Sequence, residues 1–233
     1  MKILALETSA GPASCAVVED GVVLASAYNN TALTHSQTLL PMTESMLAQS
    51  GISFSEIDCL AVAAGPGSFT GVRIGVAALK GLAFAHNKPC VGVSTLEAIA
   101  RNAVGIGFMG VVCAAMDARC RQVYTACFNV EDGTFERISD DEAISTDELK
   151  ARLASFGKPI LLLGDGAKLC YNEFAEDVSQ LHLAAEHIRF QTAVGVAAAA
   201  VSYETVTAET LQPIYLRLPQ AERELRARTK VAE

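Results

Sequence analysis

The sequence constrains the fold most strongly through two short turns, Asp20-Gly21 and Glu131-Asp132-Gly133, each of which separates two strand-like apolar segments. Asp-Gly pairs favour the tight turns that join antiparallel strands into hairpins. A further strand-like segment precedes each hairpin, and a helix-like segment and another strand follow it. The same order of elements therefore occurs twice along the chain, which predicts a duplicated α/β fold.

The expected elements occupy similar places in the two halves. The first half is expected to contain strands at 2–8, 13–19, 22–28, 57–64 and 91–93, with helices from Ser36, at 72–85 and at 95–103. The second half is expected to contain strands at 111–116, 122–129, 135–138 and 160–163, with helices at 146–157 and 191–203. This order is typical of the duplicated actin-like ATPase fold (ASKHA, ribonuclease-H-like) with two lobes. A doubly wound Rossmann sheet is disfavoured, because hairpin turns and not helices join the first three strands.

The predicted division places the first lobe at 1–103, the second at 104–217 and a basic tail at 218–233. Apolar residues make up 51% of the 233 residues and charged residues 19%, which is a composition that excludes extensive disorder. The net charge is −8, and it is uneven, because residues 1–216 carry −10 and the remainder carries +2. An acidic surface repels phosphates, so we expect the chain alone to bind RNA weakly.

Cysteine usage and hydropathy indicate a soluble protein of the cytoplasm. The chain has seven cysteines and no CxxC pair, and four of them lie inside apolar, strand-like runs. An odd number of unpaired cysteines favours a reducing compartment. The longest apolar run, 71–85, contains Arg73 and Lys80 and is short for a bilayer crossing, so no membrane association is expected.

Two segments could hold phosphate. Glu7-Thr8-Ser9 follows the first strand, and a carboxylate with hydroxyls and backbone N–H groups suits a phosphate-bound cation. The loop from Gly65 to Gly71 links a buried strand to a helix, but it lacks the Gly-Lys-Ser/Thr of a Walker A motif. We favour a structural role for the loop, in which Gly65 and Gly67 permit unusual backbone angles and Ser68 or Thr70 caps the helix. A vestigial phosphate site at Glu7, Thr8, Ser9, Gly65 and Gly67 remains the alternative.

No catalytic residue or metal site is expected from the remaining side chains. The sequence has no HxxxH, no HExxH and no cysteine cluster, and Ser68 has no histidine near it in sequence. His35 stands where a helix begins, a position at which it is interpreted as a cap or a solvated residue.

The helix at 72–85 predicts a protein partner. Gly71, Gly75, Ala78 and Leu82 fall at i, i+4, i+7 and i+11, so small residues dominate one helix face. Small side chains allow a second helix to approach closely. The rest of the helix is also mostly apolar, and a helix of this kind is covered on most sides. We expect a partner subunit there, with Arg73 and Lys80 meeting its carboxylates, and the alternative is tight packing under the chain's own second lobe.

Five segments together resemble the TsaB (YeaZ) family: KILALETSAGPASCAVV, HSQTLLPM, GPGSFTGVRIG, MDARCRQVY and PIYLR. The first strand in that family commonly ends in Asp-Thr-Ser, whereas here it ends in Glu7-Thr8-Ser9, as in the catalytic paralogue TsaD. TsaD binds metal and nucleotide through an HxxxH pair that this sequence lacks, so the resemblance is to TsaB.

The resemblance implies an actin-like protein that is not an enzyme and has no intrinsic cofactor. It implies that the chain is a homodimer when alone and pairs with a TsaD homologue, which carries ATP and metal. A TsaE homologue is a further implied partner. The complex transfers a threonylcarbamoyl group to the adenosine beside the anticodon of ANN-decoding tRNAs, and tRNA is met only through the complex. The family's interface helices correspond to 36–48 and 71–85. The interface residues expected here are Leu39, Leu40, Met46, Gly71, Val72, Arg73, Gly75, Val76, Ala78, Leu79 and Leu82.

Two other function classes stay open. One is a stand-alone actin-like ATP-dependent phosphotransferase that uses Glu7, Thr8 and the loop from Gly65 to Gly71, and nucleotide-stimulated turnover would favour it. The other is a glycoprotease-like peptidase, which requires a nucleophile–base pair or a metal centre, and the sequence shows neither.

Overall fold

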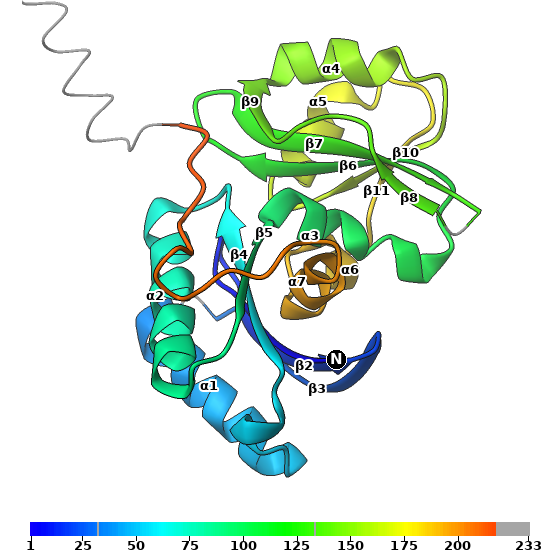
Figure 1. Cartoon of the computed structure of the whole chain (residues 1–233). Coiled ribbons are helices and arrows are strands. Elements are labelled where there is room, and N and C mark those ends of the chain that lie inside the picture. The colour runs from blue at the N-terminus through cyan, green and yellow to red at the C-terminus, as the bar shows by residue number, and fades with distance from the viewer. Residues whose placement is uncertain (32, 133, 218–233) are drawn as a thin grey trace, which may run out of the picture.

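A computed structural model describes residues 1–31, 33–132 and 134–217 and contains two sheets that face each other across a layer of helices (Figure 1). The first sheet has the strand order β3-β2-β1-β4-β5. Its strands are β1 (Lys2–Glu7), β2 (Ala13–Glu19), β3 (Val22–Asn29), β4 (Cys59–Gly65) and β5 (Cys90–Ser94). The first three strands pair antiparallel, and β4 and β5 continue the sheet parallel to β1. The predicted hairpin at Asp20-Gly21 is confirmed, with both residues at positive φ.

The second sheet repeats the first, which confirms the predicted duplication. Its order is β11-β10-β6-β7-β8, with β9 paired to β7 beside β8. Here β6 and β7 are antiparallel, while β10 and β11 run parallel to β6. The strands are β6 (Gly110–Asp117), β7 (Gln122–Glu131), β8 (Thr134–Arg137), β9 (Glu142–Ser145), β10 (Ile160–Leu163) and β11 (Leu181–Leu183). The sequence analysis did not predict the short strands β9 and β11.

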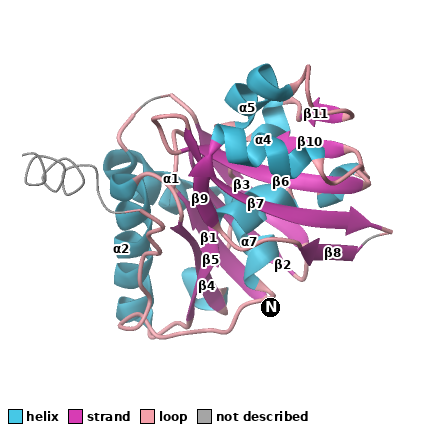
Figure 2. Cartoon of the chain, turned by 90° about the horizontal axis from the view of Figure 1, so that it is seen from above, coloured by secondary structure: helices cyan, strands magenta, loops and turns pink. Residues whose placement is uncertain are grey.

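The helices form three layers around the two sheets (Figures 1 and 2). The outer face of the first sheet is covered by α1 (His35–Ser50) and α2 (Phe69–His86), and that of the second by α4 (Thr146–Ala154) and α5 (Ala167–Phe174). Between the sheets lie α3 (Thr95–Arg101) and α7 (Ala193–Ala200). The short helices are η1 (Phe54–Glu56), η2 (Val104–Ile106) and α6 (Glu186–Arg189). Among these described helices, none combines the length and the apolar character that crossing a bilayer requires.

The two halves of the chain exchange helices, so the predicted boundary between 103 and 104 does not separate two compact lobes. Leu96 and Ile99 of α3, from the first half, pack on the second sheet. Val196 and Ala197 of α7, from the second half, pack on the first sheet. Periodicity locates helices but does not show which sheet each one covers. The predicted tail at 218–233 lies outside the described residues.

After α7 the chain returns along the first lobe as an extended segment, 206–217, which we call the strap. Val206 bridges to Cys90 at the edge of the first sheet, and the amide of Ile214 donates to the carbonyl of Ala64 at 2.7 Å. Lys80 of α2 donates to the strap carbonyls of Glu209 and Leu211. Residues 211–216 of the strap are assigned to no strand.

The small-residue face of α2 packs inside the chain, which corrects the prediction that it contacts a partner. A Cβ at Gly71 would overlap the carbonyl of Thr8, and a Cβ at Gly75 would lie 2.5 Å from Thr8 Oγ1 and 3.2 Å from Val62 Cγ2. The Thr8 hydroxyl is itself fixed, because it donates to the carbonyl of Gly71 at 2.8 Å. The alternative of intramolecular packing is therefore correct, although the contact is with the end of β1 and with β4 and not with the second lobe.

Two glycines in α2 provide a matched test of this packing. Gly75→Ala should lower the free energy of unfolding by about 1–3 kcal/mol, because the added methyl overpacks a fixed contact. Gly81→Ala should raise it by up to about 1 kcal/mol, because position 81 is exposed with nothing within 4 Å of an added Cβ. Denaturant unfolding of both variants measures the two shifts. Equal effects of the two substitutions would contradict the packing described here.

Candidate functional site: the interlobe cleft and the outer face of α2

The two lobes enclose a cleft of about 600 Å³ at the carboxyl ends of β1 and β6. The turn after β1, the loop before α2, the turn after β6 and the end of the strap all contribute to its walls. Arg217 closes one side by donating from a guanidinium nitrogen to the carbonyl of Ala118 in the second lobe at 2.6 Å. The described lining residues are Ser9, Ala10, Gly11, Pro66, Gly67, Ser68, Phe69, Thr70, Met116, Asp117, Ala118, Arg119, Tyr124, Asp165, Ile214, Tyr215, Leu216 and Arg217.

Glu7 is fully buried at the end of β1 beside this cleft. One of its carboxyl oxygens accepts from the amide of Ser9 at 2.5 Å, and the other has no partner within the described part of the chain. Burial raises the pKa of Glu7 to about 7, although the neighbouring Ser9 acts in the opposite direction. The side chain is therefore a carboxyl group that loses its proton near neutral pH.

Two backbone amides beside the cleft that could contact phosphate are already used. The amide of Ser9 donates to Glu7, and the amide of Ser68 donates to the carbonyl of Ser9 at 2.6 Å. Gly67 lies so close to Ser9 that a Cβ would contact its carbonyl oxygen at 2.5 Å. Gly65 is likewise packed against the strap carbonyl of Ile214. The residues proposed as a vestigial phosphate site thus lie together in space, and they make contacts within the chain: Glu7 bonds Ser9, Thr8 bonds Gly71, and both glycines are closely packed.

The loop keeps the structural role that the sequence predicts. Ser68 is the N-cap of α2, and its hydroxyl accepts from the amide of Gly71 at 3.3 Å. Gly65 and Gly67 both have positive φ, at 125° and 159°. His35 begins α1, and its Nε2 lies 2.7 Å from the carbonyl oxygen of Ala10. In the described residues, no three His, Cys, Asp or Glu side chains are grouped as a metal site would require.

The sequence analysis missed Asp165 as a site residue because its Gly-Asp-Gly loop lies far along the chain from the other candidate residues. It follows β10 and opens into the cleft opposite Ser9 and Gly11. The surrounding protein desolvates its carboxyl group and raises the pKa of Asp165 to about 6, with nearby Asp117 acting in the same direction. Phe69 and Tyr215 were also missed as cleft residues, because only the folded chain brings them together.

The carboxyl group of Glu7 predicts a pH-dependent stability. Its native pKa of about 7 exceeds the ordinary value of 4.5, so the native state binds the proton more tightly and stability falls as the pH rises between these values. Glu7→Gln keeps an oxygen that accepts from the Ser9 amide and removes the ionisable group. Near pH 8 its free energy of unfolding should exceed that of the parent by a few kcal/mol, because one pKa unit corresponds to about 1.4 kcal/mol.

Near pH 4 the parent and Glu7→Gln should unfold alike, because Glu7 is protonated in both states. Glu44→Gln on the exposed side of α1 controls for the loss of a carboxylate. The measurement is the free energy of unfolding across this range. Parallel pH profiles for the parent and Glu7→Gln would show that the buried carboxyl does not titrate as described.

The outer face of α2 is the second candidate surface. Ala77, Gly81 and Phe84 are exposed, and Phe84 retains 76% of its accessible surface. They fall at i, i+4 and i+7 on the side of the helix opposite Gly71 and Gly75, so α2 is apolar on both faces. On the neighbouring helix α1, Leu40 is 44% exposed. An exposed apolar helix face indicates an interaction site.

The expected interface residues divide between this outer face and the core. Seven of the expected residues are buried in the first lobe and cannot contact a partner directly. They are Leu39, Met46, Gly71, Val72, Gly75, Val76 and Leu79. Ala78 and Leu82 are half-buried against the same core, and Leu40 is open. Arg73 and Lys80, expected to meet partner carboxylates, instead bond to the strap through the hydroxyl of Tyr215 and two carbonyls.

The fold and the cleft define a two-lobed actin-like α/β protein. The solved structure of component A of (R)-2-hydroxyglutaryl-CoA dehydratase from Acidaminococcus fermentans shares this fold with a TM-score of 0.51 at 12% identity, covering 87% of this chain and 98% of that one. A YeaZ structure from Pseudomonas aeruginosa is far more similar, with a TM-score of 0.77 at 30% identity over 92% of this chain and 99% of that one.

The sequence comparisons give the family. The family model described as TsaD, tRNA N6-adenosine threonylcarbamoyltransferase, matches residues 23–224. The Bacillus subtilis tRNA threonylcarbamoyladenosine biosynthesis protein TsaB is 32% identical over 95% of this chain and 96% of its own length. The Escherichia coli TsaB is 38% identical over 64% of each chain. This chain belongs to the TsaB (YeaZ) family, which is related to TsaD.

Proposed function

We propose that the chain is a non-catalytic partner subunit in the synthesis of threonylcarbamoyladenosine in tRNA. The names of its TsaB relatives and the match to the TsaD family support a role in this modification. In the proposed complex a TsaD homologue carries the ATP, the metal and the transfer of the threonylcarbamoyl group, and a TsaE homologue assists. The chain contacts tRNA through that complex, and it is a homodimer when alone.

The observation that carries the proposal is the exposed apolar face of α2. Ala77, Gly81 and Phe84 leave a flat apolar strip beside α1, and small residues permit a partner helix to approach closely. The cleft provides separate support for the non-catalytic role. Its Ser9 and Ser68 amides are already bonded within the chain, so these two amides are not available to a triphosphate.

The test is co-purification with the host's TsaD homologue, followed by tRNA modification in vitro with and without this chain. Modification should require the chain, and the chain alone should neither modify tRNA nor hydrolyse ATP. Nucleotide-stimulated turnover by the isolated chain, lost in Glu7→Gln, would favour the phosphotransferase alternative instead. Full modification in its absence would contradict the proposed role.

Phe84→Glu should weaken association with the TsaD homologue at least tenfold. Burying a phenylalanine contributes about 1.5–3 kcal/mol, and about 1.4 kcal/mol corresponds to a tenfold change in affinity. The fold should be unaffected, because Phe84 is 76% exposed in the isolated chain. Val22→Glu, which places the same charge at a 62% exposed apolar position of β3, is the matched control. Circular dichroism confirms folding, and unchanged affinity of folded Phe84→Glu would remove α2 from the interface.

A further inference from the structure

An aromatic wall stands at the mouth of the interlobe cleft. The rings of Phe69, the first residue of α2, and Tyr215, in the strap, have centroids 4.8 Å apart, and both line the cleft. The guanidinium of Arg73 lies 3.9 Å from the centroid of the Phe69 ring, and its Nε donates to the Tyr215 hydroxyl at 2.8 Å. Tyr215 nevertheless remains 41% exposed. The two rings are therefore fixed in place while part of their surface faces the cleft.

Free hydrogen-bond donors adjoin this wall. Within the described part of the chain, the amides of Phe69 and Thr70 at the N-terminus of α2 have no acceptor. The hydroxyl of Ser9, a fully buried residue that lines the same cleft, also has no partner. A helix N-terminus attracts anions through its free amides and its dipole. Arg119, exposed on the second-lobe side of the cleft, adds a full positive charge.

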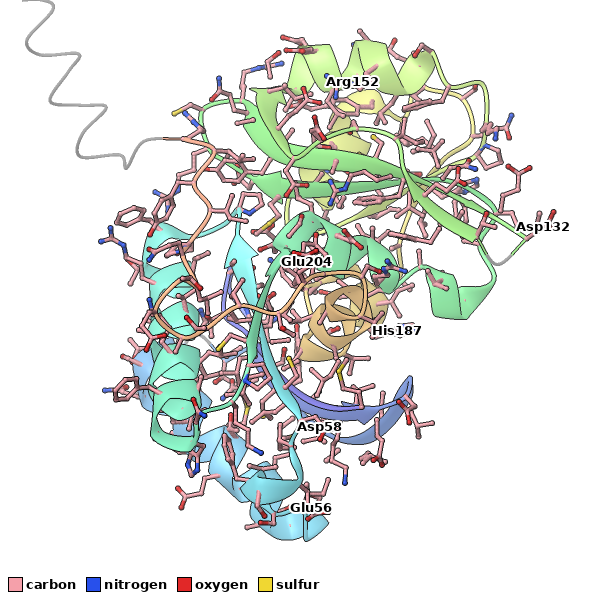
Figure 3. The ribbon with its side chains drawn as sticks, viewed as in Figure 1. Glu56, Asp58, Asp132, Arg152, His187 and Glu204 are labelled. Atoms are coloured by element: carbon pink, nitrogen blue, oxygen red, sulfur yellow. The ribbon has the colours of Figure 1, made fainter. Side chains whose placement is uncertain are left out.

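The number of phosphates that this site accepts is limited by nearby carboxyl groups. Asp117 and Asp165 line the second-lobe side, and Glu7 is buried behind Ser9. Glu56 and Asp58 lie at the end of the first lobe that is remote from the second lobe (Figure 3). A phosphate placed between the α2 amides and Arg119 would leave any further phosphates facing the carboxyl groups of Asp117 and Asp165.

We propose that the cleft mouth binds one nucleoside monophosphate unit, with its base stacked on the Phe69–Tyr215 wall and its phosphate between the N-terminus of α2 and Arg119. Stacking of a base on an aromatic side chain is a general mode of binding unpaired nucleotides. The unit comes either from a free mononucleotide or from an unpaired residue of RNA. This mode differs from that of an ATPase, which holds a chain of phosphates deep between its lobes.

The experiment titrates the isolated full chain with AMP, adenosine, ATP with Mg²⁺, and a short single-stranded RNA with its duplex as control, followed by NMR or calorimetry. AMP should bind weakly and more tightly than adenosine, and ATP with Mg²⁺ should gain nothing over AMP. Tighter binding of the single-stranded RNA than of AMP identifies an RNA residue as the source. Equal or weaker binding of the RNA identifies a free mononucleotide.

Two variants separate the base contact from the phosphate contact. Tyr215→Leu should weaken AMP about tenfold, because base stacking on an aromatic side chain contributes about 1–3 kcal/mol and about 1.4 kcal/mol corresponds to tenfold. Tyr215→Phe keeps the ring and should bind nearly as the parent does. Arg119→Met should weaken AMP without changing adenosine. Tyr28→Leu, at a 49% exposed tyrosine of β3 that does not line the cleft, is the matched control.

Several results would overturn the proposal. They are the absence of AMP binding at millimolar concentration, parent-like AMP affinity in folded Tyr215→Leu, or an ATP affinity more than tenfold above that of AMP. A thermal melt of each variant establishes that it is folded. None of these measurements involves the TsaD homologue, so failure here leaves the proposed partner role standing, and loss of partner binding leaves this site standing.

Discussion

The packing of α3 against α7 between the two sheets is the contact on which the rest of the structure depends. Both sheets bury one face on this pair, and the helices cross so closely that a Cβ at Gly195 would overlap the carbonyl of Ala98. Small residues at the crossing are necessary, because larger ones would push the helices and the two sheets apart. The layer therefore sets the separation of the lobes and, with it, the width of the cleft at their end.

The end of β1 connects this core to both candidate surfaces. Successive residues of a strand point to opposite faces, so Thr8 packs under α2 while Glu7 lies on the side that faces the second lobe. The chain then turns at Ser9 into the wall of the cleft. One short segment thus supports the helix whose outer face is exposed and also accepts hydrogen bonds from the amides of Ser9 and Ser68.

The sequence predicted the duplication, most strands and the position of α2, because hairpin turns, apolar periodicity and caps such as Ser68 are local signals. It did not predict which face of α2 is buried, since Gly71 and Gly75 are suited equally to a partner helix and to the end of β1. The short strands β9 and β11 have too few residues for a periodic pattern. Glu7 and the Gly65–Gly71 loop were found because each follows a strand, whereas Asp165 and Tyr215 reach the cleft only through long-range topology.

The placement of α7 and the strap has a consequence for the order in which the chain can fold during its synthesis. The first sheet is complete in sequence at Ser94, but the helix that covers its inner face begins only at Ala193 and the strap that bonds its edge begins at Val206. A ribosome must therefore translate nearly the whole chain before the inner face of β1, β2 and β4 can be buried. Until then that apolar face is exposed to other chains and to chaperones, so the nascent first lobe is the part of the molecule most liable to aggregate.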